Sequence, residues 1–288
     1  MKSSKKVVLL GTASSGKSTL FKIICKEDEI LSRIQLISQC IEAAVRLAKL
    51  AEEKQIHLQD KNYFLEVNPT LFMVDCTENM KQFPLVPTQM NKFLSDPNFD
   101  LVWSLRHETQ VDDATLYLMQ HFDLVWSRSS FANSHLHSHV RTVGFVDKKI
   151  SSTTTLVDCG GAKSEIPKWK YIVPTSNRIV YCVSLVDPFT QCYEDSTLNR
   201  FEHAKSCFAQ FVNTYIVPHG IRTQLVFTHV DALRNVPPPK KSALFPGKTD
   251  AQIVESIVFC FVQILECKYS VLDLLSGGGG GGSVNLEL

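Results

Sequence analysis

Apolar residues in the first part of the chain follow the spacing of a strand and then that of helices. A short apolar run at 7–10 is typical of a strand, and the run at 20–24 is typical of a helix. Between 33 and 57, apolar residues recur every three or four positions with charged residues between them, which predicts a long amphipathic helix. Prolines divide 58–100 into short pieces, and a further helical region is predicted at about 112–125.

From about residue 140 the pattern changes to short, β-branched runs that alternate with helical stretches. The strand-like runs are 140–146, 153–157, 179–185 and 224–228. The helical stretches are about 197–215 and 250–268. Strands that alternate with helices favour a mostly parallel sheet covered on both faces, so the chain is predicted to be of the α/β class.

The stretch between the first strand and the first helix matches the phosphate-loop pattern G-x-x-x-x-G-K-S/T at every fixed position. Its residues are Gly11, Thr12, Ala13, Ser14, Ser15, Gly16, Lys17, Ser18 and Thr19. A preceding strand and a following helix are the context that this motif requires. The glycines let backbone N–H groups face a phosphate, Lys17 reaches the outer phosphates, and the Ser18 hydroxyl can ligate Mg²⁺. A chance match in a glycine-rich turn is the weaker alternative.

Composition restricts the class of protein. The 288 residues, of which 44% are hydrophobic and 20% charged, are ordinary for a soluble globular chain. A net charge of +1 gives no reason to expect binding to nucleic acid or to an anionic membrane. The nine scattered cysteines form no C-x-x-C pair, and no apolar run reaches the length of a transmembrane segment. These features predict a cytoplasmic protein with reduced thiols.

Several motifs, in this order, resemble those of the α subunit of heterotrimeric G proteins. Besides the phosphate loop, the matching blocks are Gln110 to Tyr117, Arg141-Thr142-Val143-Gly144, Asp158-Cys159-Gly160-Gly161 with Ser164, Glu165 and Trp169, Thr228-His229-Val230-Asp231, and Phe245-Pro246-Gly247. The second and third resemble the family's two switch regions, and the fourth stands where its guanine-reading N-K-x-D belongs. The matching blocks extend over nearly the whole chain.

The resemblance implies a P-loop GTPase (Ras-like) fold, a mostly parallel sheet with an inserted all-helical domain. Residues 1–32 and 136–275 are expected to form the Ras-like nucleotide-binding domain, and 33–135 the inserted helical domain. Residues 276–288 are expected to be a flexible tail, because the six glycines at 277–282 cannot hold a helix. A short polar-apolar tail after them is more often disordered than a strand.

The resemblance also implies a set of nucleotide-binding residues. Beyond residues 11–19 they are Arg141, Thr142, Asp158, Gly160, Gly161, Thr228, His229 and Asp231. Ser18 and Thr142 are implied as protein ligands of Mg²⁺, Asp158 as the holder of a metal-bound water, and the Gly161 N–H as the sensor of the terminal phosphate. For Thr142, an ordinary strand threonine is the alternative.

Three positions depart from the family's catalytic pattern. His139 stands in place of the switch arginine, Ala162 in place of the water-orienting glutamine, and Ser14 in place of the phosphate-loop glutamate. No catalytic residue is therefore predicted. Because loss of such an arginine alone costs about 10³-fold or more, very slow or absent GTP hydrolysis is expected.

Base recognition is expected to be weakened as well. Asp231 can accept hydrogen bonds from the ring N–H and the amino group of guanine. Thr228 is expected to be too short to link the base to the phosphate loop as the family's asparagine does. His229 can stack on the base. An ordinary turn at the end of a strand is the alternative for this segment.

His135, His137 and His139 alternate in a way that would put three imidazoles on one face of an extended strand. No cysteine or carboxylate stands at zinc-binding spacing from them, so a solvated polar linker is preferred over a metal site.

Two family elements are expected to be missing. The family's amino-terminal helix docks the βγ partner and carries lipid, but here the first strand begins near Lys6. Its last helix engages receptors, but here the polyglycine tract stands in that place, and 269–275 is interpreted as a remnant of the last strand. We therefore expect weakened docking to βγ and effectors. Receptor coupling is expected to be doubtful, and contact with the membrane is expected only through partners.

The leading hypothesis is a G-protein α-like signalling protein that binds GTP and GDP with Mg²⁺ and hydrolyses GTP slowly or not at all. Two alternatives stay open. One is a scaffold or decoy that keeps the fold but binds nucleotide poorly. The other is a P-loop nucleotidase with a different base preference.

Overall fold

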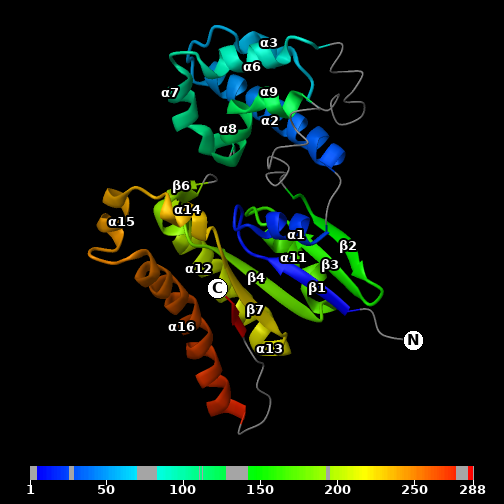
Figure 1. The fold of residues 1–288 in the computed structure, drawn as a ribbon, viewed down its shortest axis with the longest axis vertical. Helices are drawn as coiled ribbons and strands as arrows, with labels where there is room; N and C mark the ends of the chain where they lie inside the picture. Colours follow the sequence, from blue (N-terminus) through cyan, green and yellow to red (C-terminus); the bar gives the residue numbers. More distant parts are fainter. Residues whose placement is uncertain are drawn as a thin grey trace. The chain divides into compact units, whose positions relative to one another are not determined.

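The computed structural model describes residues 5–25, 29–69, 83–109, 111, 113–127, 142–192, 195–276 and 285–287. The chain divides into an α/β unit, formed by 1–25, 142–192 and 197–288, and a helical unit, formed by 26–141 and 193–196 (Figure 1). The predicted class, an α/β fold with a mostly parallel sheet, is confirmed.

The elements of the described chain fall into three groups. The strands are β1 (Lys5–Leu10), β2 (Phe145–Ser151), β3 (Thr154–Cys159), β4 (Arg178–Ser184), β5 (Gln191–Cys192), β6 (Asp195–Asn199), β7 (Thr223–Thr228) and β8 (Asn285–Glu287). The α-helices of the α/β unit are α1 (Lys17–Cys25), α11 (Trp169–Ile172), α12 (Arg200–Phe211), α13 (Val217–His219), α14 (Val230–Arg234), α15 (Pro238–Leu244) and α16 (Asp250–Ser276). Those of the helical unit are α2 (Glu29–Glu53), α3 (Lys61–Glu66), α6 (Val86–Leu94), α7 (Phe99–Ser104), α8 (Asp113–Gln120) and α9 (Phe122–Trp126).

The six-stranded sheet has the order β2-β3-β1-β4-β7-β8. All its neighbouring strands run parallel except β2, which is antiparallel to β3. The phosphate loop follows β1, Asp158 lies near the end of β3, and Thr228 ends β7. Because the carboxyl ends of parallel strands meet at one edge of a sheet, these three segments lie together there, which is the usual ligand-binding edge of an open α/β sheet.

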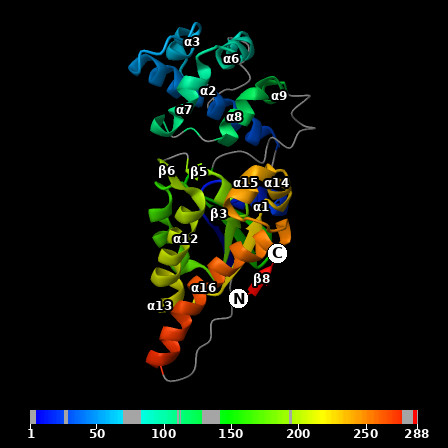
Figure 2. The same ribbon diagram turned by 90° about the vertical axis from the view of Figure 1, so that its left-hand side faces the viewer.

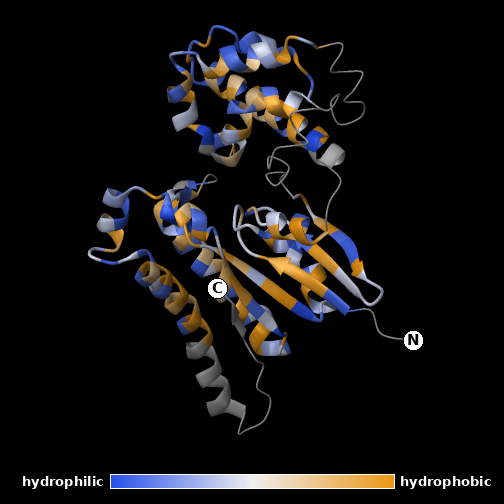
Figure 3. Cartoon of the chain, viewed as in Figure 1, coloured by the Kyte–Doolittle hydropathy of each residue, from blue (hydrophilic) through white to orange (hydrophobic). Residues whose placement is uncertain are grey.

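Alternation along the central strands divides the apolar residues between the two faces of the sheet. Val8 and Leu10 of β1 belong to the larger core, which also includes Phe208 of α12 and Phe261 of α16. Leu9 faces the opposite way and packs with apolar residues of α1 and β3. Figure 2 shows α12 and α16 along the sheet, and Figure 3 shows the hydrophobic character of β1, β4 and β7. Two buried faces explain why these strands read as continuous apolar runs.

The helical unit is built around α2. Its buried apolar residues recur at helical spacing, and they are Leu36, Ile37, Cys40, Ile41, Ala43, Ala44, Val45, Leu47, Ala48, Leu50 and Ala51. Phe64, Phe93 and Phe99 pack on this core in edge-to-face contacts with ring centroids 5.1 and 5.7 Å apart. The long amphipathic helix predicted from the spacing is therefore present, and it begins four residues earlier, at Glu29.

Three expectations about strands are wrong. The strand predicted at 140–146 is β2, which begins only at Phe145 because Gly144 has a positive φ of 69° that no extended strand contains. Every residue of β2 is exposed and three are charged, so this edge strand lacks the apolar signal of the others.

The segment 269–275, interpreted as a strand remnant, is part of the helix α16. Apolar residues at 257, 261, 265 and 272 keep helical spacing through this segment, which explains the outcome. The last residues, expected to be disordered, include strand β8, which pairs with Gln224–Val226 of β7. The glycines at 277–282 lie outside the described residues.

Candidate functional site

The phosphate loop has the backbone conformation that its glycines permit. Gly11 has φ of 140°, and a Cβ there would lie 2.3 Å from the Cys182 carbonyl oxygen of β4. Gly16 has φ of 80°, and its Cβ would press on the Thr228 side chain. Ser14, exposed at the loop's turn, also has a left-handed φ of 57°. Glycine is therefore required at both fixed positions of the motif by the loop's own geometry.

Lys17, the first residue of α1, is a buried cation. Its side chain is only 4% exposed, and Nζ donates to the Thr12 carbonyl oxygen at 2.8 Å and to Ser15 Oγ at 3.4 Å. Burial lowers the pKa of Lys17, and the nearby Asp158 carboxylate opposes this shift. A desolvated ammonium at a helix amino terminus makes this loop a strong anion site.

Three oxygen atoms from distant parts of the chain converge beside Lys17. Ser18 Oγ and Thr142 Oγ1 both donate to Asp158 Oδ2 at 2.6 Å, and the two hydroxyl oxygens are 2.6 Å apart. The second carboxylate oxygen, Asp158 Oδ1, is buried and has no hydrogen-bond partner among the residues that the structure describes. Two hydroxyls and a carboxylate are the hard oxygen donors that Mg²⁺ prefers. Thr142 lies outside any strand, so the alternative of an ordinary strand threonine is wrong.

The paired glycines after β3 make close backbone contacts possible. A Cβ on Gly161 would lie 2.4 Å from both the Gly11 carbonyl oxygen and Lys17 Nζ. Gly161 is thus pressed against the phosphate loop, and a side chain there would displace the lysine. Ala162 follows it and is buried, with a methyl group that cannot hydrogen-bond to water.

The base-reading turn connects to the phosphate loop through a hydroxyl. Thr228 Oγ1 donates to the Ser15 carbonyl oxygen at 2.9 Å, with the Val183 carbonyl oxygen at 3.2 Å. Thr228 therefore reaches the phosphate loop, because the loop backbone itself approaches β7 at Gly16. That it is too short to link a base to the loop stays a prediction. Asp231 lies in the first turn of α14 and is exposed.

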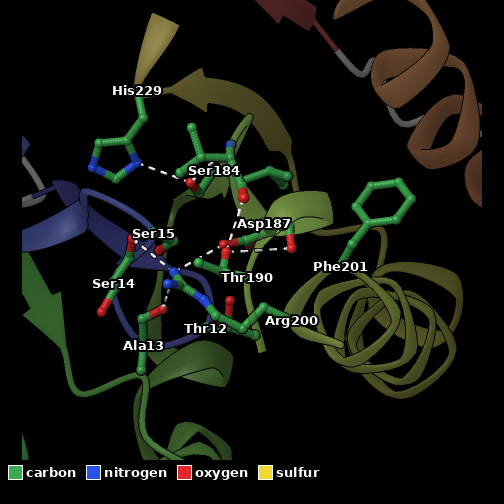
Figure 4. A network of polar contacts seen from close by, with 12 residues as sticks. Thr12, Ala13, Ser14, Ser15, Ser184, Asp187, Thr190, Arg200, Phe201 and His229 are labelled. Carbon is green, nitrogen blue, oxygen red and sulfur yellow. Dashed lines mark hydrogen bonds and ion pairs between the residues drawn. The ribbon is translucent and has the colours of Figure 1, made fainter. Parts of the chain in front are cut away.

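His229 has a left-handed φ of 63°, and its imidazole is held by Ser184 at the end of β4. The Nδ1–Oγ distance is 2.9 Å (Figure 4). Burial and the Arg200 charge lower the pKa of His229, while Asp231 opposes the shift. The lowered pKa favours the neutral imidazole, and the contact with Ser184 orients the ring.

An ion pair behind the phosphate loop was not predicted. Arg200, at the start of α12, lies 2.8 Å from Asp187, and its Nη2 also donates to the carbonyl oxygens of Ala13 and Ser14 at 3.4 and 3.3 Å (Figure 4). The Asn199 side chain caps α12 by accepting from the Phe201 N–H, which fixes where the helix starts. An Asp two residues after the strand predicted at 179–185 was the only sequence signal for this pair.

The Asp187→Asn variant should alter the pH dependence of stability. Burial raises the Asp187 pKa from 3.8 to about 6, although Arg200 opposes the shift. The folded state then binds a proton more tightly than the unfolded state, so this carboxyl stabilises the protein as pH falls from about 6 to 3.8. As the pH falls from about 6 to 3.8, the unfolding free energy of the wild type should rise by roughly 3 kcal/mol relative to that of the variant. Each tenfold difference in proton affinity between the folded and unfolded states contributes about 1.4 kcal/mol.

Urea unfolding of both proteins at a series of pH values measures this difference, and the other carboxyl groups cancel in the comparison. The Asp250→Asn variant, which breaks a partly exposed ion pair with Lys241, is a matched control that should show a smaller pH dependence. A constant difference between wild type and Asp187→Asn across the window would contradict the raised pKa.

Some predicted positions lie outside the described residues. They are Gln110, Asp112, His135, His137, His139 and Arg141. Among the residues that the structure does describe, no group of three His, Cys, Asp or Glu side chains could hold a metal ion. No helix in the described part of the chain is long and apolar enough to cross a membrane.

Comparison with known proteins finds similarity to G-protein alpha subunits. A family model described as G-protein alpha subunit matches residues 1–258. The guanine nucleotide-binding protein alpha-9 subunit of Dictyostelium discoideum is 24% identical over 228 residues, covering 72% of this chain and 64% of that protein. The alpha-12 subunit of the same organism is 27% identical over 230 residues, covering 73% and 64%. The alpha-1 subunit of Arabidopsis thaliana is 24% identical over 230 residues, covering 71% and 60%. The chain thus spans less than two thirds of the length of these relatives.

Proposed function

The chain belongs to the G-protein alpha-subunit family, and from this premise we propose that it binds guanine nucleotide together with Mg²⁺ and acts as a signalling switch. The observation that carries the proposal is the convergence of Ser18, Thr142 and Asp158 beside the buried Lys17. A lysine and a cluster of hard oxygen donors at a phosphate loop suit a nucleoside triphosphate bound with a divalent cation.

The residues at this cluster fit Mg²⁺. Ser18 and Thr142 would supply hydroxyl ligands, and Asp158 would hold a metal-bound water, with its unpartnered Oδ1 able to accept from that water. Bound there, Mg²⁺ neutralises negative charge on the phosphates. Thr142 belongs to a segment far along the chain from the phosphate loop. Its ordering around a terminal phosphate is the kind of switch that this class of protein uses.

Guanine preference is proposed to rest on Asp231, with Thr228 and His229 shaping the site. The Thr228 hydroxyl supports this by tying the end of β7 to the phosphate loop. The Ser184 hydrogen bond supports His229 as a stacking surface for the base. Other members of the proposed nucleotide site are Thr12, Ala13, Ser14, Ser15, Gly16, Thr19, Arg141, Gly160 and Gly161.

Hydrolysis is proposed to be slow or absent. Buried Ala162, directly after the glycine that touches Lys17, offers no hydrogen-bonding group to orient an attacking water. His139 and Ser14 replace the charged pair that the family resemblance implies for their positions.

Organisation and partners are proposals at family level. Residues 1–32 and 136–275 are proposed as the nucleotide-binding domain, 33–135 as the helical domain and 276–288 as a tail. A βγ subunit and effectors are the proposed partners. A cytoplasmic location, peripheral to the membrane through partners, is proposed with them.

Tryptophan fluorescence tests the proposed function. Trp169 is buried, and its indole N–H donates to the Gly160 carbonyl oxygen next to the phosphate loop. Adding GTPγS with Mg²⁺ should change the emission of a variant in which Trp103 and Trp126 are replaced by Phe. ATPγS should produce little change.

The control is the same protein with Trp169 also replaced by Phe, which should give no signal. An equal response to ATPγS would favour the nucleotidase alternative. Absence of binding in equilibrium dialysis with both nucleotides would favour the scaffold and would contradict the proposal.

A further inference from the structure

Glu165 is a buried carboxylate at the segment between β3 and α11. Its side chain is 10% exposed, and Oε1 lies 2.6 Å from Lys168 Nζ. The other oxygen, Oε2, accepts a hydrogen bond from the backbone N–H of Gly144 at 2.8 Å. A largely desolvated carboxylate aimed at one backbone N–H of a distant segment fixes that segment in place, since a charged acceptor makes a stronger hydrogen bond than a neutral one.

The backbone around Glu165 is shaped to admit this side chain. A Cβ on Gly160 would lie 2.7 Å from Glu165 Cγ and 2.9 Å from its Cβ. Gly160 therefore makes room for Glu165, whereas its neighbour Gly161 makes room for Lys17 and the phosphate loop. The two glycines of the motif serve different contacts.

The hydrogen bond from Gly144 to Glu165 lies close in sequence to the oxygen cluster formed by Ser18, Thr142 and Asp158. Gly144 lies two residues after Thr142, whose hydroxyl belongs to the cluster with Ser18 and Asp158. The Gly160 N–H also donates to the Gly144 carbonyl oxygen at 2.9 Å, so both polar groups of the Gly144 backbone are held by the segment after β3. Gly144 itself has a left-handed φ of 69° and open space around its Cα, so its geometry depends on these two bonds.

The same contacts reach Trp169. Its indole N–H donates to the carbonyl oxygen of Gly160 at 3.0 Å, and its ring packs edge-on against Tyr181 and Phe211 in the core. Gly160 is thus hydrogen-bonded both to Gly144 and to a buried indole. These contacts all lie within the α/β unit.

We infer that Glu165 is a positioning residue for the proposed magnesium site: by holding the Gly144 N–H, it places the Thr142 hydroxyl against Ser18 and Asp158. This inference rests on the proposed function. Groups that orient metal ligands without touching the metal affect metal affinity strongly, and among the described residues the Gly144 N–H has no second acceptor to replace a lost Glu165 oxygen.

The Glu165→Ala variant tests the inference with two readouts. In the background with Trp169 as the sole tryptophan, the Mg²⁺ concentration for half-maximal response at saturating GTPγS should rise by about tenfold or more. Nucleotide affinity in excess EDTA should stay close to that of the wild type, because the Glu165 carboxylate binds Lys168 and Gly144, which lie outside the phosphate loop. A general loss of structure would change both.

Two variants separate the roles of the carboxylate. Glu165→Gln keeps an oxygen that can accept from the Gly144 N–H, so it should restore most of the Mg²⁺ response. Lys168→Gln removes only the ion pair with the half-exposed lysine and should have little effect. An unchanged Mg²⁺ titration in Glu165→Ala, or an equal loss in Lys168→Gln, would overturn the inference.

Hydrogen exchange in the nucleotide-free protein keeps the two proposals distinguishable. The Gly144 amide should exchange at least about tenfold faster in Glu165→Ala than in wild type or Lys168→Gln, because the carboxylate oxygen that accepts its hydrogen bond is gone. If wild type binds no nucleotide, the proposed function fails, and this exchange rate alone decides whether Glu165 positions the segment at 142–144. Wild-type exchange in Glu165→Ala would refute the positioning role.

Discussion

The Lys17→Ala variant is expected to lose at least about a hundredfold in affinity for GTPγS, because removing one member of a buried, hydrogen-bonded charge pair costs about 3 kcal/mol or more. Lys17 is almost completely buried, and its ammonium lies beside both the phosphate loop and Gly161. Its lowered pKa shows that burial penalises the charge, and a bound phosphate would compensate for that penalty. Equilibrium dialysis with labelled GTPγS measures the loss.

In this variant, nucleotide affinity and thermal stability should respond differently to the loss of the lysine. Without nucleotide, removing a buried charge whose desolvation is costly should leave the melting temperature little changed, whereas the stabilisation normally produced by GTPγS and Mg²⁺ should disappear. Lys22→Ala is a matched control, since Lys22 is also a buried lysine of α1 but lies one turn beyond the loop. Retained affinity in Lys17→Ala, or equal loss in Lys22→Ala, would exclude this loop as the phosphate site.

Restoring the three departures from the family pattern is expected to accelerate GTP hydrolysis by about 10³-fold or more, which corresponds to about 4 kcal/mol of barrier. The variant combines Ser14→Glu, His139→Arg and Ala162→Gln, so that the new arginine has a carboxylate partner and the attacking water has an amide to orient it. Single-turnover release of phosphate from preloaded protein is the measurement.

Ala162→Gln alone serves as the control and should recover only part of the rate, because the arginine supplies most of the charge stabilisation. Ala162 is buried, so the unfolding free energy of each variant must be measured to exclude overpacking as the cause of a low rate. The proposal of slow hydrolysis fails if the wild type already hydrolyses GTP as fast as the triple variant.

Periodicity and one motif were enough to predict the class of the fold. The runs at 7–10, 179–185 and 224–228 became β1, β4 and β7 because strands buried on both faces leave an unbroken apolar signal. Strand β2 was misplaced because an exposed edge strand with three charged residues carries no such signal. Hydrophobic patterns along a sequence predict buried strands, and every residue of β2 is exposed.

The candidate site was predictable where a motif fixes the spacing and not where contacts join distant segments. The phosphate loop, Asp158 and the paired glycines follow from short patterns. The Arg200–Asp187 pair and the bond from Thr228 to Ser15 depend on how β4, β7 and the loop approach in space. The spacing of residues in a single sequence does not predict which distant segments come into contact.

The fit between Gly160 and Glu165 has an evolutionary consequence. A methyl group at 160 would collide with the first carbons of the Glu165 side chain rather than with its flexible end. A larger residue at 160 is therefore compatible with this fold only in a chain where residue 165 has become small as well. The two positions should be inherited as a pair, and a descendant that changed one would be under selection to change the other.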